Sequence, residues 1–195
     1  MPGYGEEAPV STDMGEWVSR ILECGDGLHV IAHSYGGLAA ILSAVIAPQQ
    51  VRSLTLFEPA AYAYARGMPK TEAFISRMAP IVERAAETTA AEYHVAFLTA
   101  LTGSVPPQPV DAVELRAAER NRLLDAPWNY NLPIEVLQRV PTLVLSGGWS
   151  DDYEEIATAM ASGGARHLVL GGYGHRVQDH PEANPAIACW ILSNS

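Results

Sequence analysis

A serine with small neighbours follows a short apolar run and precedes a segment of helical composition. The apolar run 28–32 leads to Ser34, and residues 35–47 then suit a buried helix. A serine hydroxyl becomes a useful nucleophile when it is held clear of the backbone, beside a base and near donors for the developing oxyanion. A tight turn from strand to helix provides these conditions. Ala32 and Gly36 stand two positions either side of Ser34, where we expect a larger side chain to collide as the backbone reverses. The pattern predicts nucleophilic chemistry at Ser34, although a glycine-rich connection alone would give the same five residues.

A second segment supplies a candidate general base. Gly174 and His175 follow the apolar run 167–170, the last strand candidate of the chain. Loops at the carboxyl ends of parallel strands converge on the ligand site of an open sheet. A histidine there can accept the serine proton and return it to a leaving group. We therefore predict His175 as the base and expect the other histidines to be structural, namely His29, His33, His94, His167 and His180.

Two carboxylates compete for the role of orienting His175 and stabilising its cationic form. Glu58 ends the apolar run 51–57, one crossover after Ser34. A carboxylate at the end of a buried strand needs a partner, because an unpaired charge is costly there. Asp151 is the first carboxylate after the next apolar run. These residues favour Glu58 and leave Asp151 open, and either could instead be a solvated loop carboxylate.

The composition limits the class of partner. The 195 residues are 48% hydrophobic, which is enough for one domain with a substantial core. The formal net charge of −10, from 12 Lys and Arg against 22 Asp and Glu, disfavours nucleic acid and anionic membrane surfaces. We therefore expect a small neutral substrate. Cys24 and Cys189 lack the spacing of metal ligands or of a disulfide framework, so buried free thiols in a reducing compartment are expected.

From the sequence we expect neither a secretory signal nor a membrane span. The first seven residues contain no basic side chain and no apolar run, so cytoplasmic location is the default expectation. Residues 27–51 carry no charge, but Gly36, Gly37 and Pro48 divide them into a buried strand and a buried helix of ordinary length.

Apolar periodicity divides the chain into elements that would position these residues. Strands are expected at 28–32, 51–57, 141–146 and 167–170, and helices at 11–24, 35–47, 152–161 and 182–193. Between them, residues 60–139 have helical spacing and no strand candidate. The alternation predicts an α/β fold with a parallel sheet of about four strands. Its core would be 1–59 and 140–195, with 60–139 inserted as a helical lid.

Together these motifs resemble the α/β-hydrolase superfamily. Ala32-His33-Ser34-Tyr35-Gly36 is similar to its nucleophile elbow, G-x-S-x-G, with Ala in place of the first Gly, and Gly174-His175 resembles its histidine loop. The resemblance, which is closest to small bacterial members, implies a serine esterase or lactonase with an acyl-enzyme on Ser34. It implies no cofactor and no metal, and it places the backbone N–H of Tyr35 in the oxyanion hole. The superfamily's acid commonly lies near Asp151, whereas haloalkane dehalogenases and lactone-hydrolysing relatives carry it where Glu58 stands.

The resemblance also predicts what the chain lacks. The superfamily sheet has about eight strands, and residues 1–5 resemble the loop after the fourth, so we expect the chain to begin halfway through the fold. The loop that supplies a second oxyanion donor would be absent, which costs about 10²–10³ in rate. A binding protein on a hydrolase scaffold is therefore the alternative function. Strand 28–32 would become an apolar edge. Three explanations are open: the chain is a fragment, it forms a homodimer across this edge, or the remaining fold is stable as a monomer.

The expected lid could also contribute to substrate binding. Its aromatic residues would either line an acyl pocket or form the lid's own core. They are Tyr62, Tyr64, Phe74, Phe97 and Trp128.

Overall fold

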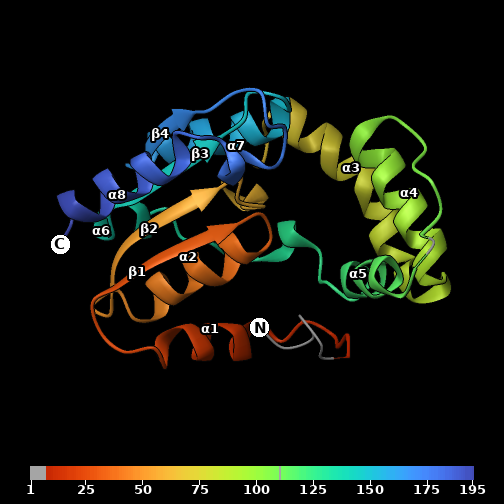
Figure 1. Cartoon of the computed structure of the whole chain (residues 1–195), viewed down its shortest axis with the longest axis horizontal. Helices are drawn as coiled ribbons and strands as arrows, with labels where there is room; N and C mark the ends of the chain where they lie inside the picture. Colours follow the sequence, from red (N-terminus) through yellow and green to blue (C-terminus); the bar gives the residue numbers. More distant parts are fainter. Residues whose placement is uncertain (1–7, 110) are drawn as a thin grey trace. The chain divides into compact units, whose positions relative to one another are not determined.

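Four parallel strands form one sheet in the order β1-β2-β3-β4 (Figure 1). The computed structural model describes residues 8–109 and 111–195, so the loop expected at residues 1–5 lies outside the described residues. The strands are β1 (Leu28–His33), β2 (Val51–Phe57), β3 (Thr142–Ser146) and β4 (Arg166–Val169). The central strands β2 and β3 are almost entirely buried, as in a sheet covered on both faces. The predicted α/β class with about four parallel strands is confirmed.

Helices connect and flank the strands. They are α1 (Met14–Leu22), α2 (Gly36–Ile46), α3 (Pro69–Glu83), α4 (Ala90–Thr102), α5 (Ala112–Arg122), α6 (Val136–Arg139), α7 (Asp151–Ser162) and α8 (Ala183–Ser193). Short 3₁₀ turns cover η1 (Tyr62–Ala65), η2 (Ala85–Glu87), η3 (Pro127–Asn129) and η4 (Val177–Asp179). Among the described residues, no helix combines the length and apolar character needed to cross a bilayer.

The helix expected over 11–24 is shorter in the structure. Both the backbone N–H and the hydroxyl of Thr12 donate to the carbonyl of Leu123, which draws this part of the chain away from a helical path. At the other end, Cys24 N–H donates to the carbonyl of Ile21, three residues back, so the last turn is tighter than an α-helix. Local propensity therefore overestimates this helix at both ends.

Contacts between residues divide the chain into two units. One consists of residues 8–14 and 73–126, and the other of Gly15–Glu72 and Pro127–Ser195. In the first unit, Thr89 and Glu92 form a reciprocal capping box at the start of α4. The Arg122 guanidinium donates to the carbonyl of Ala85 over 2.9 Å. The bond from Arg122 connects α5 to the segment before α4.

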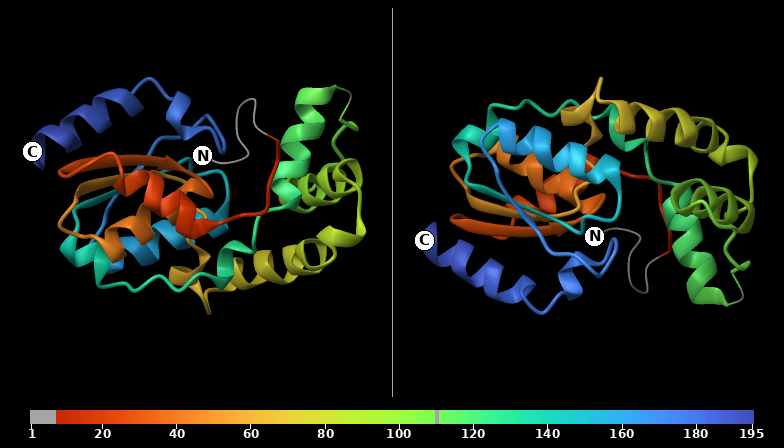
Figure 2. Two further views of the ribbon diagram at one scale, coloured as in Figure 1. Left: turned by 90° about the horizontal axis from the view of Figure 1, so that it is seen from below. Right: turned by 90° about the horizontal axis from the view of Figure 1, so that it is seen from above.

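The second unit contains the sheet and its covering helices. Helices α2 and α7 lie on one face and α8 lies on the other (Figure 2). Under α8, a buried apolar cluster includes Phe57, Leu145 and Val177. The Trp190 indole N–H of α8 donates to the carbonyl of Leu54 over 3.1 Å. The helix is thus fixed to the sheet by packing and by one polar contact.

Strand β1 lies at one edge of the sheet. Within the described residues it pairs with β2 alone, and the Ile31 side chain on it is 48% exposed. This matches the apolar edge expected from the sequence.

Cys24 and Cys189 are free thiols, but both are exposed, so the expectation of buried thiols is wrong. Cys24 lies in the turn after α1, and Cys189 lies on α8.

Candidate active site

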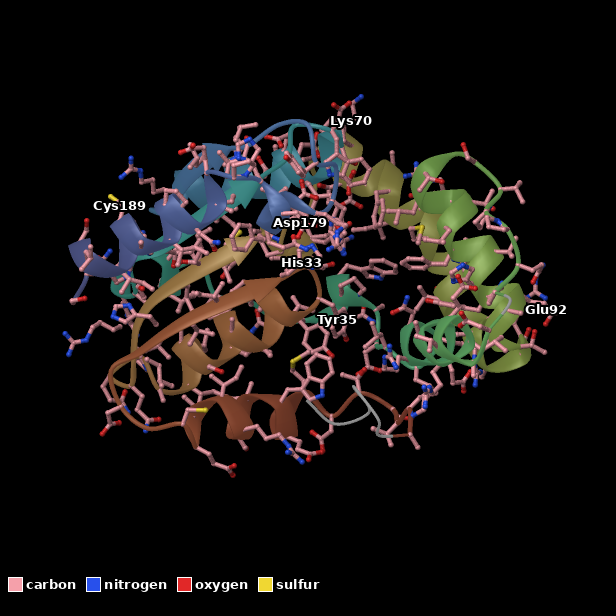
Figure 3. The ribbon with its side chains drawn as sticks, viewed as in Figure 1. His33, Tyr35, Lys70, Glu92, Asp179 and Cys189 are labelled. Carbon is pink, nitrogen blue, oxygen red and sulfur yellow. The ribbon has the colours of Figure 1, made fainter. Side chains whose placement is uncertain are left out.

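Ser34 occupies the sharp turn between β1 and α2. Its φ of 54° lies in the left-handed region, which residues other than glycine rarely adopt. Its N–H donates to the carbonyl of Phe57 over 2.9 Å, and its own carbonyl accepts the N–H of Ala60 over 3.0 Å. The end of β2 therefore holds the strained turn. Its neighbours His33 and Tyr35 lie at the carboxyl ends of the strands (Figure 3).

The turn needs a glycine at position 37 rather than at position 36. A Cβ added at Gly37 would lie 2.8 Å from the Cβ of Pro59 and 3.2 Å from its Cα. A Cβ added at Gly36 would meet no atom within 4 Å. The prediction that a larger side chain would collide at Gly36 is therefore wrong. The close approach is between the first turn of α2 and the loop after β2, where the backbone of Pro59 cannot give way cheaply.

His175 joins Ser34 to Glu58. The Ser34 hydroxyl lies 3.0 Å from Nε2 of His175, and Nδ1 of His175 lies 2.7 Å from Oε2 of Glu58. Because a carboxylate only accepts, Nδ1–H donates to Glu58 and leaves Nε2 to accept the serine proton. The structure thus brings together three of the residues singled out in the sequence, each from a different loop at the carboxyl end of the sheet.

The Glu58 carboxylate is buried and fully bonded. Its side chain has 0% exposure. Besides His175, it accepts the N–H of Gly147 at Oε1 and the indole N–H of Trp149 at Oε2, both over 2.8 Å. Such charge-assisted bonds make the burial of a carboxylate tolerable. Glu58 also has a φ of 41°, so the backbone is strained at the acid as well as at the serine.

Asp151 lies elsewhere. It begins α7, its side chain is 71% exposed, and its Oδ2 pairs with Nζ of Lys70 over 2.7 Å. Lys70 projects outward, apart from His33 and Tyr35 (Figure 3). Of the two candidate acids, the structure therefore brings only Glu58 to His175.

His33 contacts His175, and the sequence analysis did not predict this contact. Its Nε2 lies 2.8 Å from the backbone carbonyl of His175, and the two imidazole rings are 4.5 Å apart. Burial, followed by repulsion from His175, lowers the pKa of His33. A neutral His33 can donate Nε2–H to that carbonyl and so hold the His175 loop. Its position directly before Ser34 in the sequence was the signal that could have indicated a place in the site.

Aromatic rings surround the imidazole of His175. Tyr153 stacks on it at 5.0 Å with an interplanar angle of 30°, and Trp149 meets it edge-on at 6.1 Å. Both residues come from the segment around Asp151, and no spacing rule marks them in the sequence. A stacked aromatic face favours a cation, so these rings suit the imidazolium that forms during proton transfer.

The aromatic residues expected in an acyl pocket belong to both units. In the sheet's unit, Tyr62 and Trp128 pack edge to face at 6.3 Å. In the other unit, Phe97 stacks on Tyr93 at 5.7 Å, and Phe74 is buried.

The described residues contain no candidate metal site. Across residues 8–109 and 111–195, no three His, Cys, Asp or Glu side chains form a group that could hold an ion.

Comparison with curated proteins gives one partial relative. The dihydrolipoyllysine-residue acetyltransferase component of the acetoin cleaving system of Cupriavidus necator is 35% identical over 95 residues. The match covers 43% of this chain and 25% of that protein. This chain therefore spans about a quarter of the length of that relative.

Solved structures share the fold. NosK from Streptomyces actuosus is 23% identical with a TM-score of 0.60, over 100% of this chain and 84% of NosK. MenH from S. aureus is 18% identical with a TM-score of 0.66, over 99% and 81% of the two chains. A thermophilic esterase from Thermogutta terrifontis is 19% identical with a TM-score of 0.55, over 100% and 79%. At these identities the likeness is one of fold.

A sequence model of the alpha/beta hydrolase family matches residues 1–184, which is most of the chain. The match covers the turn at Ser34, the loop of His175 and Glu58 at the end of β2. The resemblance drawn from the motifs is confirmed, and the chain belongs to the alpha/beta hydrolase family.

Proposed function

We propose that this hydrolase is a serine hydrolase that cleaves a carboxylic ester or a lactone through an acyl-enzyme on Ser34. The observation that carries the proposal is the chain of two hydrogen bonds from Ser34 through His175 to Glu58, of 3.0 and 2.7 Å. These distances fall within the reach required of a nucleophile, a base and an orienting group. The esterase from Thermogutta terrifontis among the structural neighbours supports the substrate class.

Acylation begins at the Ser34 hydroxyl. Oγ attacks the carbonyl carbon of the substrate while Nε2 of His175 takes the hydroxyl proton. Glu58 stabilises the resulting imidazolium through Nδ1–H. The tetrahedral intermediate then collapses, the bond to the leaving oxygen breaks, and His175 returns the proton to that oxygen. The product is an alcohol, or in a lactone the hydroxyl end of the same molecule, and an ester on Ser34.

Deacylation repeats the sequence with water. His175 removes a proton from a water molecule, whose oxygen attacks the acyl carbon. Collapse of the second tetrahedral intermediate releases the carboxylic acid and returns the proton to Oγ of Ser34. In both halves the developing oxyanion needs donors, and the backbone N–H of Tyr35, the residue after the nucleophile, is one of them.

Steady-state hydrolysis of short p-nitrophenyl esters and of simple lactones tests the proposal. We expect Ser34→Ala and His175→Ala to lower kcat at least about a thousandfold, because each removes a member of a unit that acts together. Ser43→Ala is the matched control, since the Ser43 hydroxyl is buried in α2 and donates to the carbonyl of Ala39, four residues back in the same helix. Activity that survives in folded Ser34→Ala would refute the mechanism. A folded but inactive wild type would favour a binding protein on this scaffold.

A further inference from the structure

The loop between β3 and α7 holds the acid of the proposed site. The N–H of Gly147 and the indole N–H of Trp149 both donate to the Glu58 carboxylate over 2.8 Å. A Cβ added at Gly147 would lie 2.5 Å from the carbonyl oxygen of Gly174 and 2.9 Å from Cδ1 of Trp149. These distances leave no room for a side chain. The loop therefore contacts both Glu58 and the backbone directly before His175.

Two consecutive glycines make this loop flexible by composition. Gly147 has no space for a side chain, and Gly148 has a φ of 65°, in the left-handed region that favours glycine. Glycine loses more conformational freedom on ordering than any other residue. Both backbone positions must nevertheless be fixed if the loop is to keep its two donors on Glu58. Further contacts are needed to hold the loop in that one conformation.

Glu154, in the first turn of α7, supplies such a contact. Its Oε1 accepts the N–H of Gly148 over 2.9 Å, and its side chain is 31% exposed. Its Oε2 lies 3.7 Å from Nε2 of His167, and that nitrogen lies 2.6 Å from the hydroxyl of Ser146. Ser146 directly precedes Gly147 in the chain. The contacts therefore form a closed ring around the start of the loop.

The Ser146, His167 and Glu154 side chains do not repeat the arrangement at Ser34. Ser146 is 1% exposed, and its hydroxyl and the Glu154 carboxylate approach the same nitrogen of His167. A nucleophile and its orienting acid must instead bond to the two different nitrogens of the base. This set therefore supports the loop and is not a second nucleophile with its base.

We infer that Glu154 is a positioning residue of the proposed site, which holds Gly148 so that the loop gives both of its donors to Glu58. The inference rests on the proposed function. With both donors in place the Glu58 carboxylate is fixed, so that Nδ1–H of His175 meets it and Nε2 faces Ser34. Glu154 acts on the reaction only through the loop.

Glu154→Ala tests the inference in steady-state hydrolysis of short p-nitrophenyl esters, because it removes the acceptor for Gly148. We expect kcat and kcat/KM to fall together by about 10–10²-fold, since the loss is of positioning and not of substrate binding. Glu154→Gln keeps an oxygen for the N–H of Gly148, so its kcat should stay within about threefold of the wild type.

Glu72→Ala is the matched control. Glu72 is also a partly exposed carboxylate that accepts a glycine N–H, that of Gly67, over 2.7 Å. Gly67 likewise has a positive φ, of 85°. Its kcat should stay within about a factor of two of the wild type, because the substitution is at the surface and apart from the loop. Equal losses of kcat in Glu72→Ala and Glu154→Ala would overturn the inference.

A second measurement does not depend on turnover. Proton NMR should show the Nδ1–H of His175 far downfield, because this hydrogen bonds to a carboxylate, and His175→Ala assigns the signal by its absence. We expect the signal to weaken or move upfield in Glu154→Ala and to remain in Glu154→Gln. A folded Glu154→Ala enzyme with the kcat or the downfield signal of the wild type would overturn the inference. If the wild type is inactive but shows the signal, the proposed function fails, and the signal in the two variants still decides the role of Glu154.

Discussion

Replacing Glu58 by Gln tests which carboxylate serves His175. The carboxylate of Glu58 accepts three hydrogens, from Gly147, Trp149 and His175. In Gln the oxygen can still accept from Gly147, but the amide nitrogen then faces the two other donors. Nδ1 of His175 must give up its hydrogen and accept one from the amide. The hydrogen moves to Nε2, which can no longer take the proton of Ser34.

This change of tautomer sets the magnitude. The corresponding Asp to Asn change in a serine protease triad costs about 10⁴ in kcat. At about 1.36 kcal/mol for each factor of ten, that is about 5.5 kcal/mol of lost transition-state stabilisation. Asp151→Asn is the matched control. It removes an ion pair with Lys70 that is exposed and therefore strongly screened by solvent, so kcat should stay within about a factor of two.

The assay is hydrolysis of p-nitrophenyl acetate by both variants, with circular dichroism and thermal unfolding to establish that each is folded. Trp149→Phe removes one of the three donors without adding a new one, and should lower kcat by less than Glu58→Gln does. Loss of activity in Asp151→Asn, with activity retained in Glu58→Gln, would refute the assignment of the acid.

Three further predictions follow from the packing, the sheet edge and the buried histidine. Gly37→Ala should lower the free energy of unfolding by about 1–3 kcal/mol because its Cβ meets Pro59, whereas Gly36→Ala should leave it unchanged; urea denaturation distinguishes them. We propose that β1 pairs with β1 of a second copy, so light scattering should find a dimer that Ile31→Lys dissociates, and a wild-type monomer would exclude it. The pKa of His33 is lowered in the folded state, so the unfolded chain binds the proton first as pH falls below 6.5, and stability declines there. His33→Gln should weaken that decline, and an unchanged pH dependence of urea midpoints would contradict it.

The strands could be predicted from the sequence because each contains a short run rich in apolar residues, and these runs are most deeply buried in β2 and β3. Glu58 could be placed for a related reason, since a charge at the end of such a run requires a partner. Thr12 shows the limit of local patterns. Its bonds to Leu123 join residues far apart in the sequence, and they keep Thr12 out of the helix that its neighbours favour. Periodicity indicates which residues share a face, but it carries no information about where separate loops meet.

The site shows the same limit. Gly36 fits the five-residue motif, yet the close contact falls on Gly37, because it depends on the position of Pro59. Asp151 lies one residue beyond the commoner place for the acid in the chain, and in the structure it pairs with Lys70 at the surface. Tyr153 belongs to no motif and becomes visible only when α7 is folded beside His175.

An activated serine can be detected directly with a fluorophosphonate probe, which forms a covalent adduct on a serine that has a working base. The measurement is peptide mapping by mass spectrometry after brief labelling of the wild type and of His175→Ala. We predict one adduct, on Ser34, in the wild type and strongly slowed labelling in the variant. An adduct on another residue, or a folded wild type that does not label at all, would contradict it.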